Sequence, residues 1–214
     1  MGLRKVIPIG MNGNLLELID DLKASFQIPA VLDDAPQFQR KQFEGIPILP
    51  ISCMSDDAPA SFLCMIGSPR SFPSRAGIVE RIGVQPQGYV TFIHPDASVS
   101  HRARIGHGTA LYGGVLVTSN GEIGNHVLIL PRTICHHDTV IGDFSIIGAG
   151  VILAGGVRIG RGCYVASGSV IRDGTTVGDG AMIGMGSVVV RDVAPGAVVA
   201  GNPARPLKSR DRAT

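Results

Sequence analysis

The second half of the chain repeats every six residues, and this period limits the fold more than any other feature of the sequence. An apolar residue occurs at sixteen consecutive positions spaced by six. These positions are Val99, Ile105, Leu111, Val117, Ile123, Ile129, Cys135, Ile141, Ile147, Leu153, Ile159, Val165, Ile171, Val177, Ile183 and Val189. Neither an α-helix nor a simple sheet has a period of six, whereas a parallel β-helix of hexapeptides does. The spacing therefore predicts a solenoid whose apolar side chains fill its interior.

A second period, of eighteen residues, predicts the shape of each coil. Isoleucine–glycine or valine–glycine pairs recur at this spacing, at Ile105-Gly106, Ile123-Gly124, Ile141-Gly142, Ile159-Gly160 and Val177-Gly178. Because eighteen residues are three hexapeptides, we expect a triangular coil with three short faces. Three places after each apolar position the chain carries mostly Gly, Asn, Asp, Arg or His. Glycine, Asn and Asp are typical of the left-handed backbone that a tight corner requires.

The repeat begins near residue 90, which predicts a first domain over residues 1–89 and a second over 90–214. Only eight of the 29 glycines lie in the first 89 residues. Charged residues make up 17% of the chain and the net charge is +2, so we expect no nucleic-acid-binding surface. No apolar run approaches the length of a membrane span. The four cysteines form no C-x-x-C pair, and we expect a cytoplasmic protein with reduced thiols.

Two adjacent histidines, His136 and His137, stand directly before Asp138. Because Cys135 occupies an interior position, His136 follows it on the outside of a flat face, where an exposed surface residue is the simplest interpretation. His137 lies beside the corner that Asp138 occupies. A neutral imidazole can act as a general base when it lies within reach of the proton that it removes. We therefore assign candidate catalytic roles to His137 and Asp138; alternatively, Asp138 only tolerates the left-handed corner.

The segment HHDTVIGDF, residues 136–144, resembles the H-[DE]-C-x-I-G-D-F segment of the nucleotide-aminosugar N-acetyltransferases and sialic acid O-acetyltransferases. These are hexapeptide-repeat acyltransferases, and the resemblance implies a left-handed β-helix, acetyl-CoA as acyl donor, and His137 as the base with Asp138 orienting its ring. Some members carry a second histidine where this chain has Ile146. Stabilisation of the oxyanion would then fall to a backbone N–H such as that of Gly155.

Two further expectations follow from comparison with relatives of this fold. The β-helical carbonic anhydrases carry an H-x-x-x-x-H pair, which this chain lacks, so we expect no metal. Relatives form homotrimers with active sites between neighbouring subunits. Apolar residues at outward positions, Tyr112, Leu130 and Val190, are consistent with such buried faces.

The segment VVAGNPARPLK, residues 198–208, resembles the G-x-P-A-[RK] ending of hexapeptide acyltransferases, which lies along the coenzyme A tail in that family. Small residues along the coils would let the pantetheine arm approach the backbone, and two cations suit its phosphates. The implied donor-binding residues are Ala154, Gly155, Ala166, Ser167, Gly184, Met185, Pro203, Arg205 and Lys208. The alternative is that the small residues only satisfy the turns.

The first 89 residues read as a small parallel-sheet α/β domain, Rossmann-like in its alternation of strands and helices. We expect strands in the segments KVIPIG, IPAVLDD and SFLCMIGSPRS, and a helix from about Arg75 to Ile82. A helix after the first strand would bury Leu15, Leu16, Ile19 and Leu22 on one face.

A glycine turn at Gly10 and Gly13 suits a phosphate, but the third glycine of a dinucleotide fingerprint is replaced by Leu15, which argues against nicotinamide binding. The acetyltransferase family holds the nucleotide of its sugar substrate in such a domain. Its G-x-[SG]-G-H loop corresponds to residues 10–14, with Asn in place of His. The implied substrate-binding residues are Gly10, Asn12, Gly13, Asn14, Asp33, Asp34, Gly67, Ser68 and Arg70.

Together these features predict an acetyl-CoA-dependent N-acetyltransferase that acts on the amino group of a nucleotide-linked amino sugar, in surface-glycan biosynthesis. Two alternatives stay open. The first is an O-acetyltransferase for sialic acid or a related sugar. The second is a sugar-nucleotide-binding trimer without catalytic activity, which the isoleucine at position 146 keeps under consideration.

Overall fold

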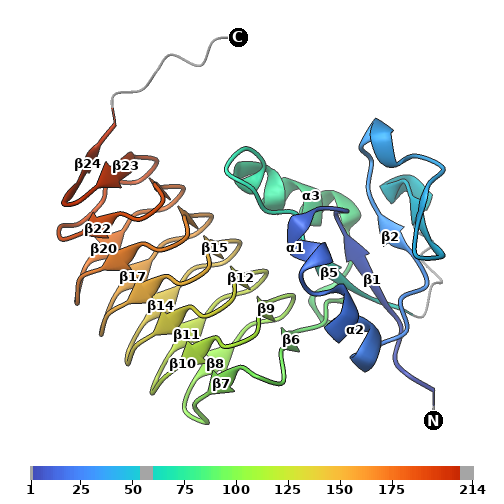
Figure 1. Ribbon diagram of the computed structural model, residues 1–214, viewed down its shortest axis with the longest axis horizontal. Coiled ribbons are helices and arrows are strands. Elements are labelled where there is room, and N and C mark those ends of the chain that lie inside the picture. Colours follow the sequence, from blue (N-terminus) through green and yellow to red (C-terminus); the bar gives the residue numbers. More distant parts are fainter. Residues whose placement is uncertain (1, 54–59, 208–214) are drawn as a thin grey trace.

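The computed structural model describes residues 2–53 and 60–207. Its N-terminal part is a small sheet with helices, and its C-terminal part is a stack of triangular coils (Figure 1). The two parts lie side by side, and the N-terminal part packs along one face of the lower coils. The hexapeptide period thus predicted the architecture of the second half of the chain.

The coils form three sheets of two-residue parallel strands, and from Phe92 to Val189 each strand pairs with strands eighteen residues away. The first sheet, here called the apolar face, holds β7 (Ser98–Val99), β10 (Leu116–Val117), β13 (Ile134–Cys135), β16 (Ile152–Leu153), β19 (Val170–Ile171) and β22 (Val188–Val189). The second, the charged face, holds β8 (Arg104–Ile105), β11 (Glu122–Ile123), β14 (Val140–Ile141), β17 (Arg158–Ile159) and β20 (Thr176–Val177). The third, the covered face, holds β6 (Phe92–Ile93), β9 (Ala110–Leu111), β12 (Leu128–Ile129), β15 (Ile146–Ile147), β18 (Tyr164–Val165), β21 (Met182–Ile183), β23 (Val198–Gly201) and the antiparallel β24 (Ala204–Pro206). The final hairpin of β23 and β24 extends this sheet with longer strands.

The interior and the corners of the coils follow the predicted period. The fourteen apolar positions from Leu111 to Val189 are all buried, while Val99 and Ile105, in the first coil, are half-buried. Glycines at the corners have positive φ, as have the five non-glycine corner residues Asn120, His126, Arg132, Asp138 and Phe144. Phe144 is the unexpected member, since a bulky residue is strained in this conformation. Its ring stacks on that of His126, with centroids 4.9 Å apart.

The three faces differ in what they present to the outside. The charged face carries an ion pair between Arg104 and Glu122. The covered face buries Leu128 and Ile146 beneath the N-terminal part. The apolar face presents Leu116, Ile134, Ile152, Val170 and Val188, all half-buried, in one column along the stack.

The N-terminal part is built on a five-stranded sheet in the order β3-β4-β2-β1-β5. The strands are β1 (Val6–Ile9), β2 (Val31–Leu32), β3 (Gln42–Phe43), β4 (Ile46–Leu49) and β5 (Ser61–Cys64), and all neighbours except β3 and β4 are parallel. The helices are α1 (Gly13–Leu16), α2 (Ile19–Ser25) and α3 (Arg75–Ile82), with short 3₁₀ turns η1 (Pro36–Phe38), η2 (Ile51–Cys53), η3 (Phe72–Ser74) and η4 (Pro86–Gly88). The helix expected from about Arg75 to Ile82 has these bounds.

The first helix differs from its prediction. It is interrupted between Leu16 and Ile19, so that α1 and α2 have different registers. Leu15, Ile19 and Leu22 are buried as expected, but Leu16 is 46% exposed and Leu18 is buried in its place. The prediction for Leu16 was therefore wrong, because one continuous 3.6-residue period does not cross the break. The hairpin of β3 and β4 was not predicted from the sequence, because its strands are too short for a clear alternating pattern.

Arg75, at the start of α3, joins the two parts of the molecule. Its side chain is fully buried, and its guanidinium donates hydrogen bonds to the carbonyl oxygens of Ile66 and of His126, the latter at 2.5 Å. Burial lowers the pKa of the guanidinium below its ordinary value. The hydroxyl of Tyr112 adds a second link by donating to the Asn14 carbonyl at 2.8 Å. Tyr112 was expected on a face between subunits; instead it is buried within its own chain.

Within residues 2–53 and 60–207, no helix is both long and apolar enough to cross a membrane. The same residues contain no group of three or more His, Cys, Asp or Glu side chains that could hold a metal ion.

Candidate active site

His137 and Asp138 form a hydrogen-bonded pair at the corner between β13 and β14. Asp138 has a φ of 59°, the left-handed conformation predicted for this corner. Its Oδ2 lies 2.8 Å from His137 Nδ1, and both side chains are more than half exposed. When the Nδ1–H donates to the carboxylate, Nε2 of the neutral ring is left as a proton acceptor. The pair therefore has the geometry of an oriented general base. His136 is exposed on the flat side of the coil, as expected.

The carboxylate of Asp138 is itself held by a second side chain. Asn120, at the corresponding corner of the preceding coil, donates from Nδ2 to Asp138 Oδ1 at 2.9 Å. This hydrogen bond and the one to His137 lower the pKa of the Asp138 carboxyl below its ordinary value. Asp138 is therefore ionised at neutral pH, the form that best accepts from the imidazole N–H.

Gly155 lies against the imidazole, one coil further along the stack. A Cβ added to Gly155 would meet His137 Nε2 at 2.4 Å and Cε1 at 2.5 Å. The ring thus occupies space that any side chain at this position would fill. The Gly155 N–H makes no hydrogen bond within the part of the chain that the structure describes. An imidazole nitrogen and a backbone donor are therefore neighbours at this corner.

The predicted nucleotide-binding residues gather at the carboxyl ends of β1, β2 and β5. The Asp33 carboxylate accepts hydrogen bonds from the backbone N–H of Met11, at 2.7 Å, and of Ala35, at 2.8 Å. Asn14 Nδ2 donates to the Gly67 carbonyl at 2.8 Å, which ties the glycine turn to the end of β5. The structure therefore brings the three segments into one cluster.

Several of these residues also have local structural roles. Asn12 caps α1 by accepting from the Leu15 N–H at 3.3 Å. Asp34 accepts from the Ile51 N–H and pairs with Arg81 at 3.2 Å. Ser68 Oγ accepts from the N–H groups of Arg70 and Ser71, where the chain turns into η3. Arg70 is exposed.

The predicted donor-binding residues fall into groups at two corners and on the final hairpin. Ala154 and Gly155 lie beside His137, at the corner between the apolar and charged faces. Ala166, Ser167, Gly184 and Met185 lie at the corner between the covered and apolar faces, where Met185 is 78% exposed. Pro203 and Arg205 belong to the hairpin of β23 and β24 and are exposed. Lys208 lies outside the described residues.

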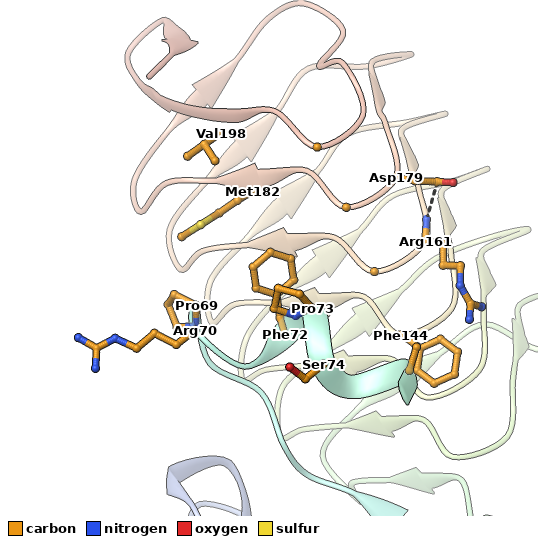
Figure 2. A pocket seen from close by; sticks show the side chains of 14 residues that line it. Pro69, Arg70, Phe72, Pro73, Ser74, Phe144, Arg161, Asp179, Met182 and Val198 are labelled. Atoms are coloured by element: carbon orange, nitrogen blue, oxygen red, sulfur yellow. Dashed lines mark hydrogen bonds between the residues drawn. The ribbon is translucent and has the colours of Figure 1, made fainter. Parts of the chain in front are cut away.

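A cavity of about 780 Å³ lies between η3 and the upper coils. Figure 2 shows Phe72 and Pro73 on the side of η3, with Met182 and Val198 on the coils above them; Arg70 extends away from the other labelled side chains. Phe144 and Arg161 line the end of the cavity at the corner between the charged and covered faces. Only Arg70 among these residues was predicted from the sequence, because segments about a hundred residues apart form the cavity.

Ile146 is not beside His137 in this chain. Its side chain is 1% exposed and lies on the covered face, where a Cβ on Gly67 would meet its Cδ1 at 2.8 Å. Ile146 therefore packs against the N-terminal part, which accounts for an apolar residue at this position.

Comparisons with known proteins agree with this arrangement. Residues 138–173 and 156–191 match the family model described as bacterial transferase hexapeptide, six repeats. The acetyltransferase domain of PglB from Neisseria gonorrhoeae, solved with acetyl coenzyme A, is 28% identical with a TM-score of 0.81, over 96% of this chain and 100% of that one. The chain therefore shares the hexapeptide repeat of bacterial transferases and resembles this acetyltransferase domain over almost its whole length.

Two more solved structures resemble the chain over almost its whole length. A variant of perosamine N-acetyltransferase from Caulobacter crescentus, in complex with CoA and GDP-perosamine, is 25% identical with a TM-score of 0.86, over 96% of this chain and 97% of that one. WeeI from Acinetobacter baumannii is 26% identical with a TM-score of 0.79, over 95% and 100%. No curated protein sequence matches the chain. The similarity to these structures includes the N-terminal part, since the matched regions extend beyond the coils.

Proposed function

We propose that this acyltransferase uses acetyl-CoA to N-acetylate the amino group of a nucleotide-linked amino sugar. The observation that carries the proposal is the His137–Asp138 pair, whose Nδ1–Oδ2 hydrogen bond leaves Nε2 as a base at an exposed corner. The relatives bound to acetyl-CoA, or to CoA and GDP-perosamine, support the choice of donor and acceptor. A role in surface-glycan biosynthesis is part of the same proposal.

In the proposed reaction, the neutral amine of the sugar attacks the thioester carbon of acetyl-CoA. His137 Nε2 takes the proton that the amine loses, and Asp138 stabilises the resulting imidazolium. The carbonyl oxygen becomes an oxyanion that accepts a hydrogen bond from the Gly155 N–H. The C–S bond then breaks, and the proton passes from His137 to the sulfur, which leaves as the thiol of CoA. The products are an acetamido sugar and free CoA.

We assign the nucleotide to a Rossmann-like domain over residues 1–89. In its sheet, β2 and β5 lie on opposite sides of β1, so the chain reverses its direction of winding beside the carboxyl end of β1. Ligands of parallel α/β sheets bind at such a switch point. Gly10, Asn14 and Gly67 meet there, which supports placing the phosphates at this edge. Asp33 and Asp34 follow β2 and are suited to a ribose or base contact.

We further propose a homotrimer of left-handed β-helices, spanning residues 90–214, in which the apolar faces surround the threefold axis. A closed ring of three copies brings unlike edges of neighbouring subunits together. The two edges of the apolar face carry different parts of the proposed site, namely His137 with Gly155 on one and Gly184 with Met185 on the other. The assembly would therefore place the base of one subunit opposite the donor-binding corner of the next.

Coenzyme A would lie along that joint between subunits. Small residues at Ala154, Ala166 and Ser167 leave room for the pantetheine arm beside the backbone. Arg205 is exposed on the final hairpin, and together with Lys208 it would pair with the phosphates.

The proposal is tested by following thiol release from acetyl-CoA with a panel of nucleotide-linked amino sugars that includes GDP-perosamine. Turnover with an amine acceptor supports N-acetylation. Turnover confined to hydroxyl acceptors such as sialic acid supports the O-acetyltransferase instead. Binding of a nucleotide sugar without turnover of any acceptor supports the non-catalytic trimer.

A further inference from the structure

Asn120 differs from the asparagine and aspartate residues that lie one place before the neighbouring corner. Along the neighbouring corner, Asn125, Asp143 and Asp179 each accept a hydrogen bond from a backbone N–H of the preceding coil, at 2.7–3.1 Å. Those side chains therefore satisfy the backbone. The Asp138 carboxylate accepts from no backbone N–H among the described residues, and its two oxygens serve two side chains instead.

From this arrangement we propose that Asn120 is a positioning residue for catalysis, which fixes Asp138 so that the carboxylate holds the proton of His137 on Nδ1. The inference rests on the proposed function of His137 as the base. Asp138 Oδ1 accepts from Asn120 at 2.9 Å while Oδ2 accepts from the imidazole at 2.8 Å. With Oδ1 occupied, rotation of the carboxylate away from the ring would break a second hydrogen bond.

Backbone conformation alone does not explain an asparagine at this corner. Asn120 has a φ of 61°, which glycine and aspartate also accommodate, and ten other corners of the stack carry glycine. Both Asn120 and Asp138 are exposed, so their hydrogen bond satisfies no buried group. The remaining effect of the Asn120 amide is its hydrogen bond to Asp138, which in turn holds the imidazole of His137.

Few charged groups lie near Asn120, His137 and Asp138 that could replace the Asn120 hydrogen bond to the carboxylate. Ser119 and Gly155 are the neighbours of His137 in the adjoining coils, and Gly156 is the other neighbour of Asp138. His101 and Asp173 lie two coils away on the His137 side, with Arg102 two coils away on the Asp138 side. No other donor to Asp138 is present among the described residues.

Two substitutions separate positioning from a purely structural role. Asn120→Gly keeps the left-handed corner and removes the donor. Asn120→Asp keeps the shape and the corner but replaces the donor with a carboxylate. We expect both to lower kcat by about tenfold with little change in KM, the lower end of the effect seen for partners that orient metal-bound histidines. Arg40→Gly, at an exposed left-handed position of the N-terminal part with a φ of 57°, is the matched control and should keep its kcat.

A second readout does not depend on acetyl transfer. Nitrogen-15 NMR of the histidine ring distinguishes the Nδ1–H from the Nε2–H tautomer, and His137→Gln assigns the signal. We expect the neutral His137 ring to be mainly Nδ1–H in the wild type and to shift toward Nε2–H in both Asn120 variants. An unchanged tautomer in the variants overturns the inference, as does a wild-type kcat. If no acceptor is turned over by the wild type, the proposed function fails while the tautomer measurement still tests Asn120.

Discussion

The imidazole of His137 packs directly against Gly155, so closely that a Cβ at residue 155 would lie 2.4 Å from Nε2. The two residues are eighteen positions apart and lie in successive coils, which is why the β-helix brings them together. Gly155 contacts the Nε2 side of the imidazole, while Asp138 is hydrogen-bonded to Nδ1 of the same ring. The position of the imidazole thus depends both on the lack of a side chain at Gly155 and on the carboxylate of Asp138.

Gly155→Ala should displace the imidazole and lower kcat by about tenfold or more, because the base must lie within hydrogen-bonding reach of the attacking amine. The fold should tolerate the change, since the added Cβ meets only the end of an exposed side chain. Steady-state kinetics and the thermal midpoint together check this. Gly77→Ala, in α3 with no atom within 4 Å of the new Cβ, is the control and should retain activity.

Polar substitution on the apolar face should dissociate the trimer. Ile152→Asp places a charge in the column of half-buried residues proposed to surround the threefold axis, where an unpaired charge is costly. Light scattering should report three times 22.3 kDa for the wild type and 22.3 kDa for the variant, which should also lose turnover. Arg158→Asp on the charged face should remain trimeric. A wild-type protein that is monomeric at assay concentrations would contradict the assembly.

Removing the buried guanidinium of Arg75 should destabilise the chain. Arg75→Ala leaves the carbonyls of Ile66 and His126 without their donor and opens a cavity at the junction. We expect a loss of about 2–5 kcal/mol in the free energy of unfolding, measured with urea. Arg70→Ala, on the exposed loop before η3, should leave that free energy within about 0.5 kcal/mol of the wild type.

Stability should decrease as the pH falls from about 6.5 to about 4. Burial, with smaller contributions from His107 and Arg75, lowers the pKa of His126 to about 4. The unfolded chain binds this proton near pH 6.5, so the stability due to neutral His126 is complete above that pH and is lost by pH 4, about 2–3 kcal/mol. His126→Asn keeps a residue suited to the left-handed corner and removes the titration. An equally steep decline in this variant would assign the effect to other groups.

The sequence was sufficient for those features that depend on local spacing. The six-residue period predicted the buried stack from Leu111 to Val189, and the corner rule predicted the left-handed backbone of Asp138. The N-terminal glycine turn and α3 were also recognised. These features follow from neighbours that the periodic backbone necessarily brings together.

Features that depend on how the two parts pack could not be predicted. Tyr112 was expected at a subunit interface, and Ile146 stands where some relatives carry a second histidine, yet the N-terminal part of the same chain covers both. In the sequence, an apolar residue that points outward is equally consistent with an interface between subunits and with packing inside one chain. The break between α1 and α2, and the cavity between Phe72 and Met182, likewise depend on contacts between distant segments.

The proposed role of His137 as the base for acetyl transfer to an amino sugar is best tested by comparing three proteins. Thiol release from acetyl-CoA is followed with a nucleotide-linked amino sugar for the wild type, His137→Ala and His136→Ala. We predict that His137→Ala lowers kcat by about 10²- to 10⁴-fold while His136→Ala, one residue away on the exposed flat side, stays near the wild type. Full activity of His137→Ala would show that His137 is not the base.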